Sequence, residues 1–266
     1  MPAQPRLARA ALHFGEEPCI SGTNGSGTVF FSGCSLACRF CQNFDISHRD
    51  FGQTVSVERL VDIFKELVES GAHNINLVNP THYAHAIEKA LSLYRPPVPV
   101  VYNSSGYEKV ETLRMLDGLI DIYLPDYKYA DDDLALACSS IKHYRETALA
   151  AIEEMLRQVG HLRIENDLAV KGTMIRHLVL PGHTQNSLAV LDDIRSHFTT
   201  DVWVSLLFQY TPVRELPQKE LNRTLTAREC RKVFDAMCER GFENGYAQEL
   251  ESATTAFIPS FDLTGI

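Results

Sequence analysis

The sequence lacks the features that mark membrane and nucleic-acid-binding proteins. No apolar run approaches the ~20 residues that span a bilayer, and residues 1–12 are too poor in apolar side chains for a secretory signal. We therefore expect no membrane segment and a cytoplasmic location. Only 25 Lys and Arg stand against 34 Asp and Glu, which gives a net charge of −9. Because nucleic-acid backbones reward basic patches, we expect no nucleic-acid partner.

The chain also lacks a complete set of four closely spaced metal ligands. Cys34, Cys38 and Cys41 lie in one short run, with gaps of three and two residues. A structural zinc site would need a fourth Cys or His at a matching spacing, and His48 lies too far along the chain. A ferredoxin would use a fourth cysteine, usually beside a proline. Three thiolates instead suit an iron–sulfur cluster with one iron left open for chemistry.

The other four cysteines show no such spacing. Seven is an odd number, and a chain of 266 residues in a reducing compartment is a poor candidate for a disulfide framework. Cys19 and Cys138 stand alone, and Cys230 and Cys238 are eight apart on one expected helix. We interpret Cys230 and Cys238 as small buried residues, and the scattered spacing of all four predicts one cluster rather than two.

The hydrophobic pattern predicts strands and helices in alternation, with no repeats and no linker. The expected strands are residues 28–31, 74–78, 98–102, 119–124, 174–180 and 202–208. The expected helices are residues 57–70, 82–94, 108–116, 131–138, 144–159, 187–198 and 227–240, the last with Thr226 as N-cap. Six βα units predict a parallel sheet with helices outside it, an α/β fold that a partial (β/α)6 barrel fits. Sites in such folds gather where the strands end.

Several segments together resemble a known family. The Cys-x3-Cys-x2-Cys run follows the first strand and has an aromatic residue, Phe40, before its last cysteine. This pattern resembles the radical S-adenosylmethionine (SAM) superfamily. Four further segments look like the PflX-type homologues of pyruvate formate-lyase activating enzyme: residues 73–83, 101–107, 121–129 and 175–182. The resemblance also implies the partial (β/α)6 barrel.

The resemblance implies cofactors and a chemistry. Cys34, Cys38 and Cys41 would bind a [4Fe–4S] cluster whose open iron is chelated by S-adenosylmethionine. Reductive cleavage would then release a 5′-deoxyadenosyl radical that abstracts hydrogen. Phe40 would lie beside the adenine or the cluster, with a plain core aromatic as the alternative.

The chain departs from the family pattern after three strands. Asn79-Pro-Thr81 stands where the superfamily often has Gly-Gly-Glu, so an amide or hydroxyl oxygen would accept from the methionine amino group. Asn103 replaces an Asp in a segment near the cofactor that includes Ser105. Thr211 stands in place of a cofactor-contacting His, in a segment that begins at Gln209. These departures favour a substrate different from that of the activating enzymes proper.

Charged residues follow two other strands. Asp126 and Lys128 are two residues apart on an extended segment, so their side chains point to the same side. They match a motif of the activating enzymes and suit the zwitterionic methionine end or a peptide, whereas a surface ion pair would contribute little. Arg176 interrupts an apolar strand, where a charge is costly unless it is paired. By resemblance it is a ligand for the methionine carboxylate.

We divide the chain into an N-terminal extension (1–24), the radical SAM partial barrel (25–241) and a C-terminal extension (242–266). Residues 13–22 are expected to cover the bottom or an edge of the barrel, and the C-terminal extension is either a cap over the substrate opening or a packed tail. The expected function is hydrogen abstraction by a radical SAM enzyme, with glycyl-radical activation of a protein as the use that the resemblance implies. The alternatives are modification of another peptide or a small metabolite, and a non-catalytic electron carrier. A flavodoxin- or ferredoxin-type protein would supply the electron.

Overall fold

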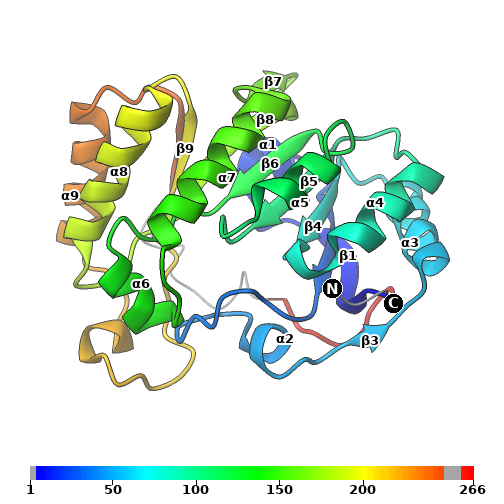
Figure 1. The fold of residues 1–266 in the computed structure, drawn as a ribbon, viewed down its shortest axis with the longest axis horizontal. Coiled ribbons are helices and arrows are strands. Elements are labelled where there is room, and N and C mark those ends of the chain that lie inside the picture. The colour runs from blue at the N-terminus through cyan, green and yellow to red at the C-terminus, as the bar shows by residue number, and fades with distance from the viewer. Residues whose placement is uncertain (1–3, 249–258) are drawn as a thin grey trace.

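A computed structural model describes residues 4–248 and 259–266 of the chain. Its centre is a sheet in which seven neighbouring strands run parallel (Figure 1), in the spatial order β10, β9, β8, β6, β5, β4, β2. These strands are β2 (Ser26–Phe31), β4 (Ile75–Val78), β5 (Val100–Ser104), β6 (Ile122–Pro125), β8 (Leu168–Leu178), β9 (Trp203–Leu207) and β10 (Gly245–Ala247). The six expected strands are all present, and β10 is an addition.

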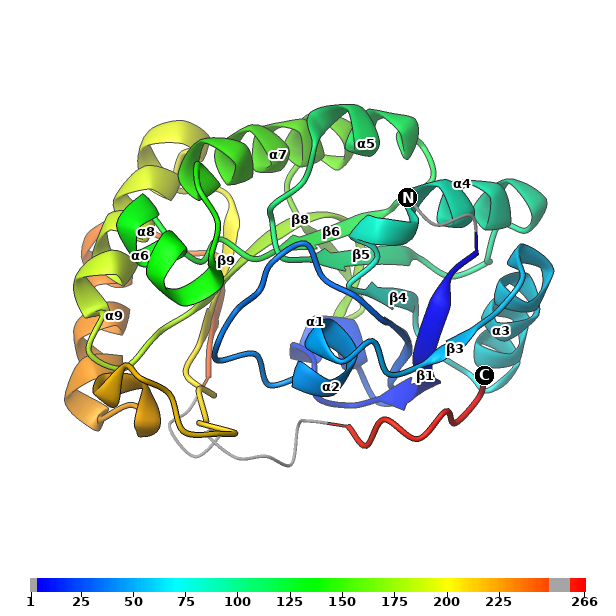
Figure 2. The same ribbon diagram turned by 60° about the horizontal axis from the view of Figure 1, so that its bottom comes forward.

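Helices cover the convex face of this sheet, and its central strands are largely buried. Every residue of β2 is buried, for example, which explains why the strands read as continuous apolar runs. Figure 2 shows the sheet curving with its larger helices outside and two short helices on the inner side. The outer helices are α3 (Val57–Glu69), α4 (Ala84–Leu93), α5 (Val110–Met115), α7 (Tyr144–Val159), α8 (Thr184–Phe198) and α9 (Ala227–Glu239). The inner helices are α1 (Pro18–Ser21) and α2 (Phe44–His48).

Helix boundaries follow local capping chemistry. Ser56 caps α3 by accepting from the Arg59 N–H, and Gly71, with a positive φ, follows the helix end. Thr226 caps α9 as expected, in a capping box with Glu229. The expected helix at 82–94 begins as a 3₁₀ turn, η1 (Thr81–Tyr83), before α4. The remaining helical segments are α6 (Asp132–Ser139) and η2 (Lys219–Asn222).

The sheet is partly open, as a partial barrel requires. It ends at β10 on one side and, on the other, at two antiparallel strands that we did not expect, β1 (Arg6–His13) and β3 (Gln53–Thr54). Residues 6–13 are therefore an edge of the main sheet rather than an appendage to it. A short strand, β7 (Arg163–Glu165), pairs antiparallel with the start of β8. That hairpin was also missed, because its residues are polar and half exposed.

The described end of the chain packs against β1. The Leu263 N–H donates to the Ala8 carbonyl (3.1 Å) and the Ala10 N–H donates to the Thr264 carbonyl (2.8 Å). Residues 249–258, which belong to the expected C-terminal extension, lie outside the described residues. The two hydrogen bonds place the end of the chain against the sheet edge of the same chain, and Pro259 lines the cavity at the cysteine loop. The role of the C-terminal extension stays a prediction. Within residues 4–248 and 259–266, no helix is both long and apolar enough to cross a membrane.

Candidate active site

A cavity of about 250 Å³ lies on the inner side of the curved sheet. Its lining includes three cysteines from the loop after β2 and polar residues from the ends of the parallel strands. The arrangement matches the expectation that site residues gather where strands end. Of the site residues predicted from sequence, the cavity brings together all but Thr81: Cys34, Cys38, Phe40, Cys41, Asn79, Asn103, Ser105, Asp126, Lys128, Arg176 and Gln209.

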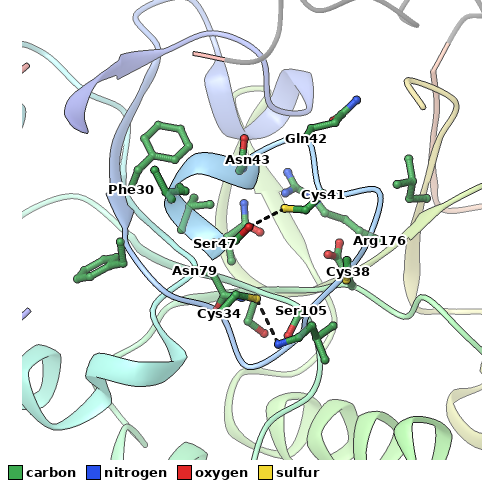
Figure 3. A pocket seen from close by; sticks show the side chains of 18 of the residues that line it. Phe30, Cys34, Cys38, Cys41, Gln42, Asn43, Ser47, Asn79, Ser105 and Arg176 are labelled. Atoms are coloured by element: carbon green, nitrogen blue, oxygen red, sulfur yellow. Dashed lines mark hydrogen bonds between the residues drawn. The ribbon is translucent and has the colours of Figure 1, made fainter. Parts of the chain in front are cut away.

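The cysteine loop leaves β2 through Gly33, whose φ of +89° suits a residue without a side chain. Cys38 is buried, while Cys34 and Cys41 are half-buried, and all three are free thiols. Figure 3 shows the three side chains in one pocket, with Ser47, Asn79 and Ser105 beside them. Burial raises the pKa of the Cys34 thiol to about 11 and that of Cys38 to about 12. Both thiols therefore need a positively charged ligand to stabilise their thiolates.

Each cysteine sulfur receives a hydrogen bond from a different part of the fold. The Ser139 hydroxyl donates to Cys38 Sγ (3.0 Å), and the Ser47 hydroxyl donates to Cys41 Sγ (3.2 Å). Cys34 Sγ accepts from the Leu36 N–H (3.4 Å). Asn79 Nδ2 also lies 3.5 Å from that sulfur. Donors of this kind orient thiolate ligands and tune the potential of an iron–sulfur cluster.

The donor set fits a cluster better than a single ion. Within the described parts of the chain, no three His, Cys, Asp or Glu side chains lie close enough together to hold one metal ion. The three thiols nevertheless line the same cavity, so they are spread more widely than the ligands of one zinc ion. A cubane of four irons and four sulfides is larger and can take one thiolate at each iron. Cys34, Cys38 and Cys41 would hold it.

Phe40 is buried and lines the cavity, where its ring lies 5.9 Å from that of Tyr210. Phe40 therefore belongs to the hydrophobic core and also lies beside the cysteines. Cys19, Cys138 and Cys230 are buried, as was expected for Cys230, but Cys238 is exposed. The expectation was wrong there because eight residues of α-helix turn by about 80° beyond two full turns, so Cys238 does not share the buried face of Cys230.

Asn79 and Thr81 bond to each other at the end of β4. The Thr81 hydroxyl lies 2.7 Å from Asn79 Oδ1, and the Thr81 N–H also donates to that oxygen (3.4 Å). The side chain of Asn79 therefore turns its NH2 group, not an acceptor oxygen, toward Cys34. Binding of the methionine amino group by Asn79 or Thr81 stays a prediction. Buried Glu108, which the sequence analysis did not single out, lies 2.5 Å from the Thr81 hydroxyl.

The N-terminal segment enters the cavity between β1 and α1. Glu16 lines the cavity and accepts from the amides of Asn76 (2.9 Å) and Asn103 (3.4 Å). Asn103 thus reaches the cavity, as predicted, but its NH2 group is bonded to the protein itself. Ser105 lies two residues further along the same segment and lines the same cavity. Its buried hydroxyl has no hydrogen-bond partner among the described residues.

Asp126 and Lys128 form the pair that their spacing predicted. Lys128 Nζ lies 2.5 Å from Asp126 Oδ2, and both side chains are largely buried at the cavity wall. Burial disfavours the charged lysine, but the Asp126 carboxylate, together with Cys38 and Cys34, outweighs this and raises the pKa of Lys128. The pair is therefore ionic and mostly shielded from water, unlike the surface ion pair that was the alternative.

Arg176 is paired with two carboxylates rather than free. Its guanidinium donates to Glu16 Oε2 (2.5 Å) and, from Nε, to Glu17 Oε1 (2.9 Å). Burial disfavours its charge, but the two glutamates outweigh this and raise the pKa of Arg176. The structure thus explains how an arginine is tolerated inside an apolar strand. Its role as a ligand for the methionine carboxylate stays a prediction, and in this structure the two glutamates engage its Nε and Nη2 atoms.

Gln209 lines the cavity after β9, whereas Thr211 does not. The Gln209 carbonyl accepts from Gln42 Nε2 (3.2 Å), and its side-chain oxygen accepts from Gln248 Nε2 (3.1 Å). These contacts join the cysteine loop to the last parallel strands. Position 209, rather than 211, is the one that the fold presents to the site.

Comparison with known proteins places the chain in a family. The profile of the Radical SAM superfamily matches residues 28–194, which include all three cysteines. The chain belongs to the radical SAM superfamily. It is also similar to the uncharacterized protein MJ0674 of Methanocaldococcus jannaschii, with 32% identity over 235 residues. That match covers 84% of this chain and 64% of the relative, so the chain spans less than two thirds of the relative's length.

Solved radical SAM structures share the fold. Streptococcus suis SuiB has a TM-score of 0.56 at 12% identity, over 86% of this chain and 50% of SuiB. SuiB has also been solved with S-adenosylmethionine and with its precursor peptide SuiA. Methylornithine synthase (PylB) has a TM-score of 0.51 at 12% identity, over 83% of this chain and 70% of that enzyme. At these identities the likeness shows the fold alone.

Membership in the family settles the cofactors. Radical SAM proteins use a [4Fe–4S] cluster together with S-adenosylmethionine. The partly open parallel sheet agrees with the solved structures. The finer resemblance to PflX-type homologues is not tested by these comparisons.

Proposed function

We propose that this radical SAM protein is an enzyme that abstracts a hydrogen atom from a peptide or protein. The observation that carries the proposal is the single cavity onto which the cysteine loop and the polar strand ends open together. When bound, the cluster and S-adenosylmethionine supply a 5′-deoxyadenosyl radical. A pure electron carrier would need no such set of polar groups beside its cluster, and this argues against the non-catalytic alternative.

The chain's own residues would hold and shield the reacting groups. The cysteines fix the cluster in the cavity wall, and Ser47 and Ser139 hold two of their sulfurs by hydrogen bonds. The Asp126–Lys128 pair offers one carboxylate and one ammonium to a zwitterionic ligand. Phe40 offers an apolar ring at the cavity, and its ring packs against that of Tyr210. The cysteines lose their thiol protons when they bind the cluster, and the Asp126–Lys128 pair orients a ligand through its fixed charges.

A peptide or protein substrate is supported by two observations. Among the described residues, the sheet is open between its edge strands, and the cavity lies on its inner side. SuiB, which shares the fold, has been solved with its precursor peptide. Within this class we propose glycyl-radical activation as the use to test first, because the motif resemblance points to it. Modification of another peptide or of a small metabolite is the alternative, and a flavodoxin- or ferredoxin-type protein is the proposed electron donor.

The proposal is tested by measuring 5′-deoxyadenosine. The protein is reconstituted anaerobically with iron and sulfide, then given dithionite and S-adenosylmethionine, with and without a peptide mixture. We expect the nucleoside from the wild type and none from Cys38→Ala. Cys230→Ala is the matched control, because it removes a buried cysteine remote from the cavity lining and should keep the activity. No product from a fully loaded wild-type protein under any of these conditions would contradict the proposal.

A further inference from the structure

Four side chains form a continuous row from the buried core to an iron-binding cysteine. Glu108, which is 2% exposed and follows β5, has its Oε1 2.5 Å from the Thr81 hydroxyl. The same hydroxyl lies 2.7 Å from Asn79 Oδ1. Asn79 Nδ2 in turn lies 3.5 Å from Cys34 Sγ. The row links the loops after three neighbouring strands, β2, β4 and β5.

The orientation of the Asn79 amide is fixed by its surroundings. Its Oδ1 faces two donors of Thr81, the hydroxyl and the backbone N–H (3.4 Å). The NH2 group is therefore the part that faces the Cys34 sulfur. The opposite orientation would place an amide NH2 against a backbone N–H and an oxygen against a thiolate, and both contacts repel.

Counting protons along the row determines the state of Glu108. A threonine hydroxyl has one proton to donate. If that proton goes to Asn79 Oδ1, the Thr81 and Glu108 oxygens are 2.5 Å apart with no proton between them unless Glu108 carries one. A protonated Glu108 donates to Thr81, Thr81 donates to Asn79, and Asn79 donates to Cys34. The second oxygen of Glu108 accepts from the Tyr102 hydroxyl (3.4 Å), so every group in the row is satisfied.

We propose that Glu108 is a positioning residue, a neutral carboxylic acid that acts through Thr81 to hold the Asn79 amide as a hydrogen-bond donor to the Cys34 sulfur. The role rests on the proposed function, since it matters only when Cys34 binds the cluster. A hydrogen bond to a ligating sulfur stabilises the reduced cluster and raises its reduction potential. Burial, which raises the pKa of Glu108 to about 7, supports the neutral form.

The test is the reduction potential of the cluster in the reconstituted protein, measured by titration monitored with electron paramagnetic resonance (EPR). Thr81→Val removes the hydroxyl at nearly constant shape, and Glu108→Ala removes the acid. Both should shift the potential to more negative values, and the double variant should shift it no further. Glu108→Gln can still donate to Thr81 and should leave the potential unchanged. Thr81→Ser should restore the wild-type value.

If Glu108 is ionised instead, the reduction potential of the cluster is expected to shift in the opposite direction. Removal of a buried negative charge near Cys34 would raise the potential in both Glu108→Ala and Glu108→Gln, and that result would overturn the inference. An unchanged potential in Thr81→Val would overturn it as well. Tyr102→Phe is the control, because it removes the long bond at the other carboxyl oxygen and leaves the Glu108 carboxyl group and the Thr81 hydroxyl in place. Iron content and thermal unfolding of each variant report whether it folds and loads.

A second measurement needs no cluster. Infrared spectra of the unreconstituted wild type at pH 6 should show the carbonyl stretch of a protonated carboxyl group that Glu108→Gln lacks. Absence of this band would refute the neutral acid even if the variants load poorly. A wild type that binds no cluster would refute the proposed function, and the infrared result would still decide the state of Glu108.

Discussion

At the scale of single residues, the buried charges of Arg176, Glu16 and Glu17, here called the cavity floor, compensate one another. Arg176 joins Glu16 and Glu17, and all three side chains are nearly inaccessible to water. Removing one member of such a network leaves the others uncompensated, which typically costs ~3–5 kcal/mol. The network therefore holds the N-terminal segment against β8 only while it is complete.

Arg176→Leu is therefore expected to lower the free energy of unfolding by about 3–5 kcal/mol, because it leaves two buried carboxylates without their cation. Urea unfolding at pH 7 measures the change. Arg49→Leu is the matched control: its side chain is 70% exposed and pairs with Asp45, which is also exposed, so a loss of at most about 1 kcal/mol is expected. Equal losses in the two variants would contradict the account of the cavity floor.

His177 makes a second residue-scale prediction, which concerns pH. Burial lowers its pKa from 6.5 to about 4, and its ring nitrogens contact the Tyr127 carbonyl (2.7 Å) and the Ser187 hydroxyl (2.8 Å). In the unfolded chain His177 has its ordinary pKa and binds a proton more readily than in the folded protein. The contribution of the neutral, buried imidazole to the free energy of unfolding is therefore fully present above pH 6.5 and is lost as the pH falls toward 4. The expected loss is about 3 kcal/mol.

Urea unfolding at pH 7 and pH 5 should therefore show a smaller pH-dependent loss for His177→Gln than for the wild type. His85→Gln is the control, because His85 is exposed on α4, and it should keep the wild-type slope. A wild-type slope in His177→Gln would show that this imidazole is not the group responsible.

The residue scale is also where prediction from sequence was least complete. The three cysteines could be identified because their spacing alone limits the chemistry. Glu16 and Glu108 could not, since each gains its importance from partners that are distant in sequence: Glu16 from Arg176, and Glu108 from Thr81. The unusual Arg in an apolar strand did signal that an acidic partner must exist, but no local pattern indicated which one.

At the scale of elements, capping chemistry links the helices to the loops around the site. Thr226 and Glu229 form the capping box of α9, and Glu229 Oε1 also accepts from the Gly182 N–H (2.8 Å) in the loop after β8. Loss of a threonine cap costs about 1 kcal/mol. Thr226→Ala should therefore lower the free energy of unfolding by about this amount, whereas Thr226→Ser should retain most of it. Denaturant titration of both variants tests this, and an unchanged Thr226→Ala would contradict it.

The parallel strands and outer helices were predictable because burial on both faces gives apolar runs and burial on one face gives helical periodicity. Expected and observed elements differ mostly by a few residues at their ends, as for β5 and β6. The antiparallel edges were missed for a physical reason. β1 has small and charged residues such as Ala8 and Arg9, and β7 is mostly polar. Their pairing is decided by neighbours that are distant in the sequence.

At the scale of the whole molecule, the fold divides seven free cysteines into protected and accessible groups. Cys38 is buried and its thiol pKa is raised to about 12, while Cys238 is exposed. Because the thiolate is the reactive form, removal of the cluster should leave Cys38 slow to alkylate and Cys238 fast. Iodoacetamide labelling at pH 8, followed by mass spectrometry, measures the alkylation rates of Cys38 and Cys238. Equal rates would contradict the burial of the cysteine loop in the cluster-free protein.

The central claim is that one loop and one cavity bind a cluster with an open iron next to S-adenosylmethionine. The most direct test is the EPR spectrum of the reduced, reconstituted protein before and after S-adenosylmethionine is added. We predict a [4Fe–4S] signal that changes on addition, because the ligand binds the iron that Cys34, Cys38 and Cys41 leave open. A signal that does not respond to S-adenosylmethionine, or a protein that binds only zinc, would contradict the account.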